Sequence, residues 1–109
     1  MAPKLAVARI LPLLFLAGFV SFSSPAKADG AAIYKAKCAM CHGADGKGNT
    51  PAGKNMGAHD FTSADVKKES DADLIAITSK GKNKMPAYGA KLSEAEIKDV
   101  IAYVRQLAK

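Results

Sequence analysis

The sequence predicts an all-α domain that follows an export segment, and three observations support this prediction. Apolar residues recur at helical spacing near the C-terminus, and capping residues stand before several short apolar stretches. No stretch alternates apolar and polar residues as a half-buried strand would. The 109 residues suit a single domain, without an internal repeat or a low-complexity tract.

The first 28 residues have the three-part layout of a secretory signal peptide. Lys4 and Arg9 give a positive start, residues 10–20 are almost wholly apolar, and Ala26 and Ala28 are the small residues expected before a cut after Ala28. The apolar run is shorter than the roughly 20 residues that span a bilayer. We therefore expect cleavage, a periplasmic location and no membrane span after processing, with a retained anchor as the alternative.

The expected domain, residues 29–109, is small and mildly basic. The export segment holds three basic residues and no acid, so the net charge of +6 for the whole chain falls to +3 for the domain. This surplus suits solubility, and we expect no nucleic-acid partner. A domain of about 80 residues often needs disulfides, a metal or a cofactor to stabilise its core. A disulfide between Cys38 and Cys41 would close a loop too short to stabilise the core, so a cofactor is expected.

Short helices and glycine-rich loops are expected along the first half of the domain. Asp29 can cap a first helix that continues towards Cys41. Residues 43–57 contain five glycines, two asparagines and a proline, so we expect a loop there. Thr62 and Asp65 resemble a weak capping box that opens a short helix.

Two further helices are expected in the second half. Ser70 is the expected cap of a helix that stops at Gly81, and residues 82–89 form the next loop. Ser93 and Glu96 make the strongest capping box in the chain and begin its best helix. The apolar face of that helix consists of Ile97, Val100, Ile101, Val104 and Ala108.

The functional interpretation depends on residues 38–42, which read Cys-Ala-Met-Cys-His. C-x-x-C-H is the pattern of covalent haem attachment. Two thiols separated by two residues in a helical turn can reach two neighbouring vinyl groups, which places His42 under the iron as the proximal ligand. Haem c is attached outside the bacterial cytoplasmic membrane, so the export segment supports the same interpretation. We expect one haem c, bound covalently by Cys38 and Cys41.

Three other interpretations of the cysteine pair stay open. A thioredoxin-like dithiol belongs in a βαβ setting, which this sequence does not predict. A closed zinc site needs four ligands, and only His42 and His59 could complete it. A plain disulfide is also compatible with export.

The ligand on the other face of the iron decides between an electron carrier and a ligand-binding or catalytic haem. We expect Met85 there, because it lies 43 residues after His42, which is enough chain to cross the haem. Pro86 also keeps Met85 out of a helix. The alternatives are Met56, His59 and an open site, whereas Met40 lies inside the attachment motif on the proximal side.

With these motifs in this order, residues 29–109 resemble the class I c-type cytochromes, the small monohaem proteins of bacterial and photosynthetic electron-transfer chains. The resemblance rests on residues 38–43, 45–48, 85–88 and 103–105. It implies about four helices wrapped round the haem. It also implies that Gly30 and Tyr34 on the first helix pack against Tyr103 on the last, and that the carbonyl of Pro51 orients His42.

An iron bound by both His42 and Met85 has no open coordination site, so we expect outer-sphere transfer of single electrons and no catalysis. The partners would be larger redox proteins that dock briefly on a monomer, with Lys80, Lys82 and Lys84 as the expected docking rim. The alternatives are a five-coordinate haem enzyme or gas sensor, a non-haem thiol oxidoreductase, and a bis-histidine cytochrome that uses His59.

Overall fold

The computed structural model describes residues 29–109 and the isolated positions 3, 12 and 18. The expected signal peptide, residues 1–28, and its cleavage site after Ala28 lie outside the described residues, apart from those three positions. Among the described residues, no helix is both long enough and apolar enough to cross a membrane.

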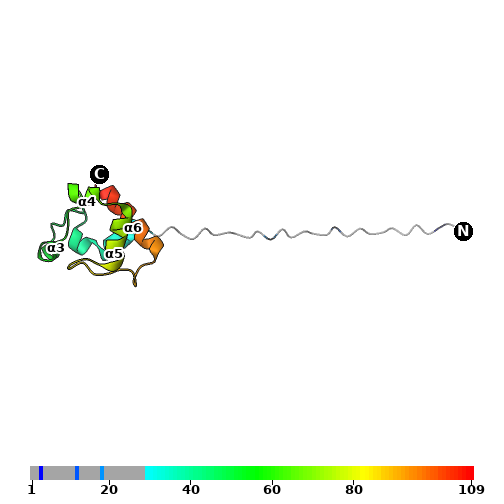
Figure 1. Cartoon of the computed structure of the whole chain (residues 1–109). Coiled ribbons are helices and arrows are strands. Elements are labelled where there is room, and N and C mark those ends of the chain that lie inside the picture. The colour runs from blue at the N-terminus through cyan, green and yellow to red at the C-terminus, as the bar shows by residue number, and fades with distance from the viewer. Residues whose placement is uncertain (1–2, 4–11, 13–17, 19–28) are drawn as a thin grey trace.

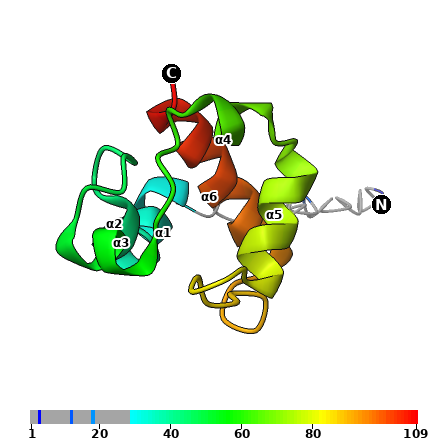
Figure 2. The ribbon, with the colours of Figure 1, turned by 60° about the vertical axis from the view of Figure 1, so that its left-hand side comes forward.

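Residues 29–109 form six helices and contain no strand beyond a single bridge between Lys82 and Met85. The helices are α1 (Gly30–Lys37), α2 (Ala39–His42), α3 (Pro51–Met56), α4 (Ala64–Lys68), α5 (Asp71–Lys80) and α6 (Glu94–Leu107) (Figure 1). In Figure 2, α6 lies in the middle, with α1 to α3 on one side and α5 on the other. The expected all-α class is confirmed, with six helices in place of about four.

The core is built on α6. The predicted capping box is present, because the Ser93 hydroxyl accepts a hydrogen bond from the Glu96 backbone N–H and the Glu96 carboxylate accepts one from the Ser93 backbone N–H. The predicted apolar face is buried along its whole length. It contributes to two clusters, one of Tyr34, Val100 and Val104 and the other of Leu92, Ile97 and Ile101.

The crossing of α1 over α6 is close because Gly30 has no side chain. A Cβ at this position would lie 2.3 Å from the carbonyl oxygen of Asp99. One turn further on, Tyr34 is buried against Tyr103, with 5.2 Å between the ring centroids. The expected packing of the first helix on the last is therefore confirmed, although Gly30 meets the backbone of α6 and not the ring of Tyr103.

The first expected helix is divided at Cys38. Asp29 caps it as predicted, since its carboxylate accepts a hydrogen bond from the Ala32 N–H. The helix does not run unbroken towards Cys41, because α1 ends at Lys37 and α2 begins at Ala39. Helical hydrogen bonds are nevertheless present on both sides of Cys38, so the two cysteines lie on successive turns.

Residues 43–57 are not entirely a loop, because α3 lies within them. Thr50 caps α3 and also donates a hydrogen bond to the Cys41 carbonyl at 2.8 Å. The proline that follows suits the first helical position, where its missing N–H leaves no partner unsatisfied. Gly53 lets α3 approach α2, since a Cβ there would lie 2.1 Å from the Cys41 carbonyl oxygen. The packing of α3 on α2 therefore stabilises a helix in a segment whose composition is typical of a loop.

The start of α4 lies one residue later than predicted. Ser63 is its cap and accepts a hydrogen bond from the Val66 N–H. Thr62 instead donates from both its backbone N–H and its hydroxyl to the Asp60 carboxylate. The choice of Thr62 as the cap is therefore wrong, because a nearer acceptor engages its side chain.

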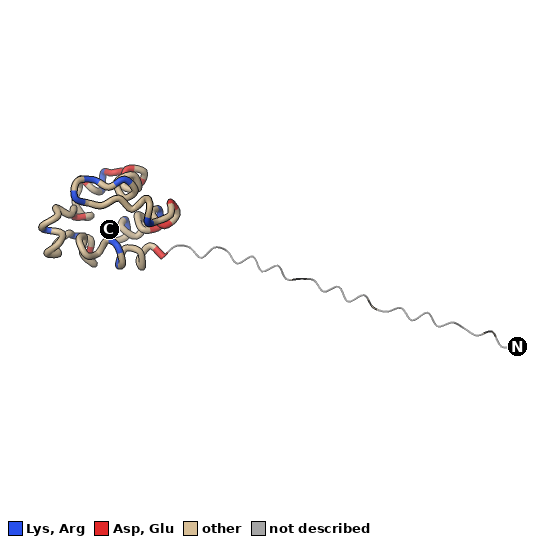
Figure 3. Tube along the Cα trace, turned by 90° about the horizontal axis from the view of Figure 1, so that it is seen from below, with Lys and Arg blue, Asp and Glu red and all other residues tan. Residues whose placement is uncertain are grey.

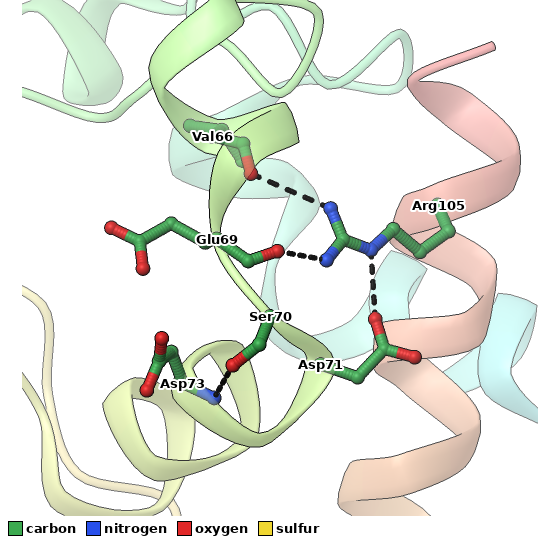
Figure 4. A network of polar contacts seen from close by, with 6 residues as sticks. All are labelled: Val66, Glu69, Ser70, Asp71, Asp73 and Arg105. Carbon is green, nitrogen blue, oxygen red and sulfur yellow. Dashed lines mark hydrogen bonds and ion pairs between the residues drawn. The ribbon is translucent and has the colours of Figure 1, made fainter.

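Arg105 on α6 holds the connection between α4 and α5 (Figure 4). Its Nε pairs with the Asp71 carboxylate at 2.9 Å, and its two terminal nitrogens donate to the carbonyls of Val66 and Glu69. Ser70, which lies between those carbonyls and Asp71, caps α5 as predicted. One guanidinium group thus fixes the end of α4 and the start of α5 against α6.

Candidate functional site

One cavity brings together parts of the chain that are far apart in sequence. It is lined by Cys38, Cys41 and His42 from the attachment motif and by Met85 from the loop after α5. Apolar side chains of α4, α5 and α6 complete its wall, among them Val66, Leu74, Ile77, Val100, Ile101 and Val104. All four sequence-predicted site residues therefore meet at one apolar cavity.

His42 uses one ring nitrogen in a hydrogen bond, while its other ring nitrogen has no hydrogen-bond partner among residues 29–109. Its Nδ1 lies 3.1 Å from the carbonyl oxygen of His59, and because a carbonyl can only accept, Nδ1 carries the proton. The ring stacks on Phe61 with 4.4 Å between centroids and 20° between planes. Burial lowers the pKa of His42, which favours the neutral ring. A neutral imidazole with Nε2 free and its plane fixed is the form that binds a metal.

The expectation that the Pro51 carbonyl orients His42 is wrong. Pro51 is the first residue of α3, and the carbonyl that meets the ring belongs to His59. The segment that carries His59 is held in place by backbone pairing, since the Phe61 N–H donates to the Gly46 carbonyl at 2.9 Å. The sequence carried no signal for this contact, because every residue has a carbonyl group.

The two cysteines are half-buried and are not joined in a disulfide. Burial, and to a smaller extent the nearby Cys41, raises the pKa of the Cys38 thiol to about 11. A thiol oxidoreductase needs a lowered thiol pKa, so this environment does not favour that alternative. Within residues 29–109, no three His, Cys, Asp or Glu side chains gather as a metal site and no βαβ unit forms. The zinc and thioredoxin-like alternatives therefore have no structural support.

Met85 is half-buried and lies in a tight turn. Its backbone exchanges two hydrogen bonds with Lys82, and Gly81 makes the turn possible, since its φ is +76° and a Cβ there would lie 2.8 Å from the Met85 carbonyl oxygen. The alternatives are less enclosed: Met56 is 43% exposed and His59 is exposed, although both also line the cavity, and Met40 is 79% exposed and does not line it.

Charged side chains also line the cavity. Lys82 and Lys84 do so as expected, and they are joined by Lys37 from the end of α1. Lys80 instead lines a separate groove between α5 and α6. Asp65 and Glu69 are the acids on the cavity, and over the whole domain basic and acidic positions are interspersed along the trace (Figure 3). The sequence could not indicate Lys37, which comes to the same cavity as the other two lysines only through the fold.

The donor set suits a covalently bound haem. One segment contributes two thiols and a neutral imidazole, and another contributes a thioether. The cavity wall between these segments is largely apolar. Thioether and imidazole are the axial ligands found in cytochromes c.

The chain matches the family model described as cytochrome c oxidase, cbb3-type, subunit III, over residues 25–104. It is 42% identical over 102 residues to cytochrome c6 from Nostoc sp. (strain PCC 7120 / SAG 25.82 / UTEX 2576), and the match covers 86% of each chain. Among solved structures, it is similar to the c-type cytochrome KustC0563, with a TM-score of 0.68 and 34% identity over 74% of this chain and 99% of that one. It is also similar to cytochrome c6 from the diatom Phaeodactylum tricornutum, with a TM-score of 0.56 and 34% identity over 73% of this chain and 91% of that one.

The family model and these relatives agree with the fold and with the residues gathered at the cavity. Because the matches extend over most of the chain, they show a common family and not only a common motif. The chain therefore belongs to the family described as cytochrome c oxidase, cbb3-type, subunit III, as a small class I c-type cytochrome that carries electrons on a covalently bound haem c.

Proposed function

We propose that Cys38 and Cys41 hold the haem through thioether bonds and that His42 and Met85 bind its iron from opposite faces. This arrangement makes the protein a carrier of single electrons and not an enzyme. The observation that carries the proposal is the single cavity lined by both thiols, by the oriented imidazole and by a thioether 43 residues further along the chain. When bound, haem c supplies a one-electron iron couple.

The residues round the cavity have distinct tasks. His42 is oriented by the His59 carbonyl and by the Phe61 ring, so its Nε2 needs no rearrangement to act as a ligand. The neutral thioether of Met85 favours reduced iron and therefore a high potential. The apolar walls limit the access of water, which also disfavours the more highly charged oxidised state.

Replacing Met85 by Ala tests this ligation. Because the Cys38 and Cys41 side chains stay unchanged, we expect the haem to remain covalently bound while one face of the iron opens. The reduced variant should bind carbon monoxide, the oxidised variant should lose the weak thioether–iron absorption band at the red end of the spectrum, and the potential should fall. Optical titration and potentiometry of the holoprotein measure all three changes.

Met56→Ala and His59→Ala are the matched controls, because both side chains also line the cavity. Each should keep the wild-type spectrum, and His59→Ala retains the backbone carbonyl that orients His42. If either control loses the band while Met85→Ala keeps it, the ligand assignment is wrong. If none of the three variants alters the spectrum, the native iron has an open or water-bound face, and an enzyme or sensor becomes the better interpretation.

We further propose that larger redox proteins dock over Lys37, Lys82 and Lys84, which line the cavity. Positive charge there would steer an acidic partner to the haem edge without binding it tightly. Lys82→Gln and Lys84→Gln should each slow oxidation by an anionic reagent such as ferricyanide and quicken oxidation by a cationic one. Lys80→Gln removes the same charge beside a different groove and should change these rates less. Equal effects of all three variants would count against a docking rim at the cavity.

The proposed location is the periplasm, after removal of residues 1–28. The support is the three-part pattern of those residues together with a family model that matches the chain from residue 25 onward. Asp29 should then be the first residue of the periplasmic protein. N-terminal sequencing would decide this, and a membrane-bound chain that still begins at Met1 would favour the anchored alternative.

A further inference from the structure

Tyr88 links two segments that are far apart in sequence and that both line the haem cavity. Its hydroxyl donates a hydrogen bond to the Lys37 carbonyl at 3.1 Å, across 51 residues of sequence. Lys37 is the last residue of α1 and directly precedes Cys38, while Tyr88 follows Met85 by three residues. This single bond therefore joins the loop that carries the thioether to the start of the attachment motif.

The position of the Tyr88 ring is fixed from its own side of the cavity. The Tyr88 backbone N–H donates to the Thr78 carbonyl at 2.9 Å, which attaches the end of the loop to α5. The ring packs against the cluster of Leu92, Ile97 and Ile101 and lines the cavity. Because the ring is held in this way, its hydroxyl can restrain the loop without first ordering a flexible side chain.

A second side chain also joins this loop to a distant segment, but it is less constrained. The Lys84 ammonium donates to the Asn55 carbonyl at 3.2 Å, and both residues are exposed. A long exposed side chain loses entropy when it is held and gains little from a solvated contact. Tyr88, which is half-buried, is the better restraint of the two.

We propose that Tyr88 is a positioning residue for Met85, and that its bond to the Lys37 carbonyl holds residues 82–89 against the end of α1 so that the thioether stays on the iron. The inference rests on the proposed ligation by Met85. In this proposal, Met85 leaves the iron when the loop moves away from α1, a movement that breaks the bond between the Tyr88 hydroxyl and the Lys37 carbonyl. The free energy of this hydrogen bond therefore lowers the affinity for any ligand that binds the iron by displacing Met85.

Imidazole binding to the oxidised holoprotein tests the inference, because imidazole must displace the thioether. Tyr88→Phe keeps the ring and removes only the hydroxyl. We expect imidazole to bind about two- to fivefold more tightly, which corresponds to the loss of one partly solvated hydrogen bond. Tyr103→Phe is the matched control, since the Tyr103 ring packs in the core and its hydroxyl makes no side-chain hydrogen bond to the described residues. It should leave imidazole affinity unchanged.

A double-mutant cycle separates positioning from simple shielding of the cavity. In the Met85→Ala background there is no thioether to displace, so adding Tyr88→Phe should leave imidazole affinity unchanged. If Tyr88→Phe strengthens binding equally in both backgrounds, Tyr88 shields the cavity and the inference fails. If it changes nothing when Met85 is present, the bond does not restrain the loop and the inference also fails. If Met85→Ala itself does not strengthen imidazole binding, the proposed ligation is wrong, which is a separate result.

Discussion

Gly30 occupies a position where helix propensity and tertiary packing act in opposite directions. It is the first residue of α1, where alanine would ordinarily favour the helix. A Cβ would, however, lie 2.3 Å from the Asp99 carbonyl oxygen and 2.8 Å from its carbonyl carbon. These atoms belong to the backbone of α6, so a rotamer change cannot move them away. Glycine is therefore required by the approach of α6 and not by the local backbone.

Gly30→Ala should lower the free energy of unfolding of the holoprotein by about 1–3 kcal/mol, the usual cost of forcing extra volume into a packed contact. Denaturant unfolding followed by circular dichroism measures the change. Ala36→Gly is the control on the exposed side of the same helix, and it should cost up to about 1 kcal/mol through propensity alone. A Gly30→Ala protein as stable as the wild type would mean that α1 and α6 can separate at no cost.

At the scale of single elements, helix starts could be predicted well where a capping side chain and the backbone N–H that donates to it lie three residues apart. Asp29, Ser70 and Ser93 each accept a hydrogen bond from the N–H three residues later, as expected. Such bonds depend on local backbone geometry, which the sequence pattern captures. The start of α4 was missed by one residue because Asp60 competes for Thr62. Helix α3 was not predicted because five glycines made its segment resemble a loop, although a threonine cap followed by a proline is a local signal for a helix start.

The capping box of α6 leads to a pH-dependent prediction. Hydrogen bonds from Ser93, chiefly from its backbone N–H, hold the pKa of Glu96 below its usual value. The ionised carboxylate therefore stabilises the fold above the usual glutamate pKa of about 4.3, and this contribution is lost as the pH falls through the folded-state pKa. Glu96→Gln keeps a capping amide but removes the charge. Its deficit in unfolding free energy should be largest near neutral pH and should vanish in acid.

Denaturant unfolding of the wild type and of Glu96→Gln, at several values between about pH 3 and pH 7, gives this deficit directly. Glu94→Gln is a suitable control, because Glu94 makes only an exposed ion pair with Lys98 and belongs to no capping box. A deficit for Glu96→Gln that does not change with pH would show that its charge contributes nothing to the helix start.

The whole molecule has a divided core. Within residues 29–109, eight hydrophobic residues are buried, and six of them form two clusters along α6 with the cavity beside them. Helix α3 packs on α2, and α5 packs on α6, so the two sides of the cavity meet mainly through the central helix and a few hydrogen bonds. A domain of this size and core depends on what fills the cavity.

Without haem, the chain should therefore be largely disordered or molten. The Cys38→Ala, Cys41→Ala double variant tests this, because it removes both proposed attachment points. Its far-ultraviolet circular dichroism should show much less helix than the holoprotein, and denaturant should produce no cooperative transition. Cys38→Ala alone retains one attachment and should stay folded at reduced stability. A native-like cooperative melt of the double variant would contradict this dependence on the cofactor.

The sequence by itself determined the all-α class, most helix starts, the attachment motif and the family resemblance, because each depends on residues that are close together in the chain or on their order along it. The sequence also indicated Met85 as the second iron ligand. This ligation remains a prediction, but the fold brings Met85 to the same cavity as His42. Only the tertiary structure decided that the His59 carbonyl, and not that of Pro51, orients His42, and that Tyr88 joins the Met85 loop to α1. Both contacts use backbone carbonyls, which every residue has, so only the folded path of the chain can select the one that is used.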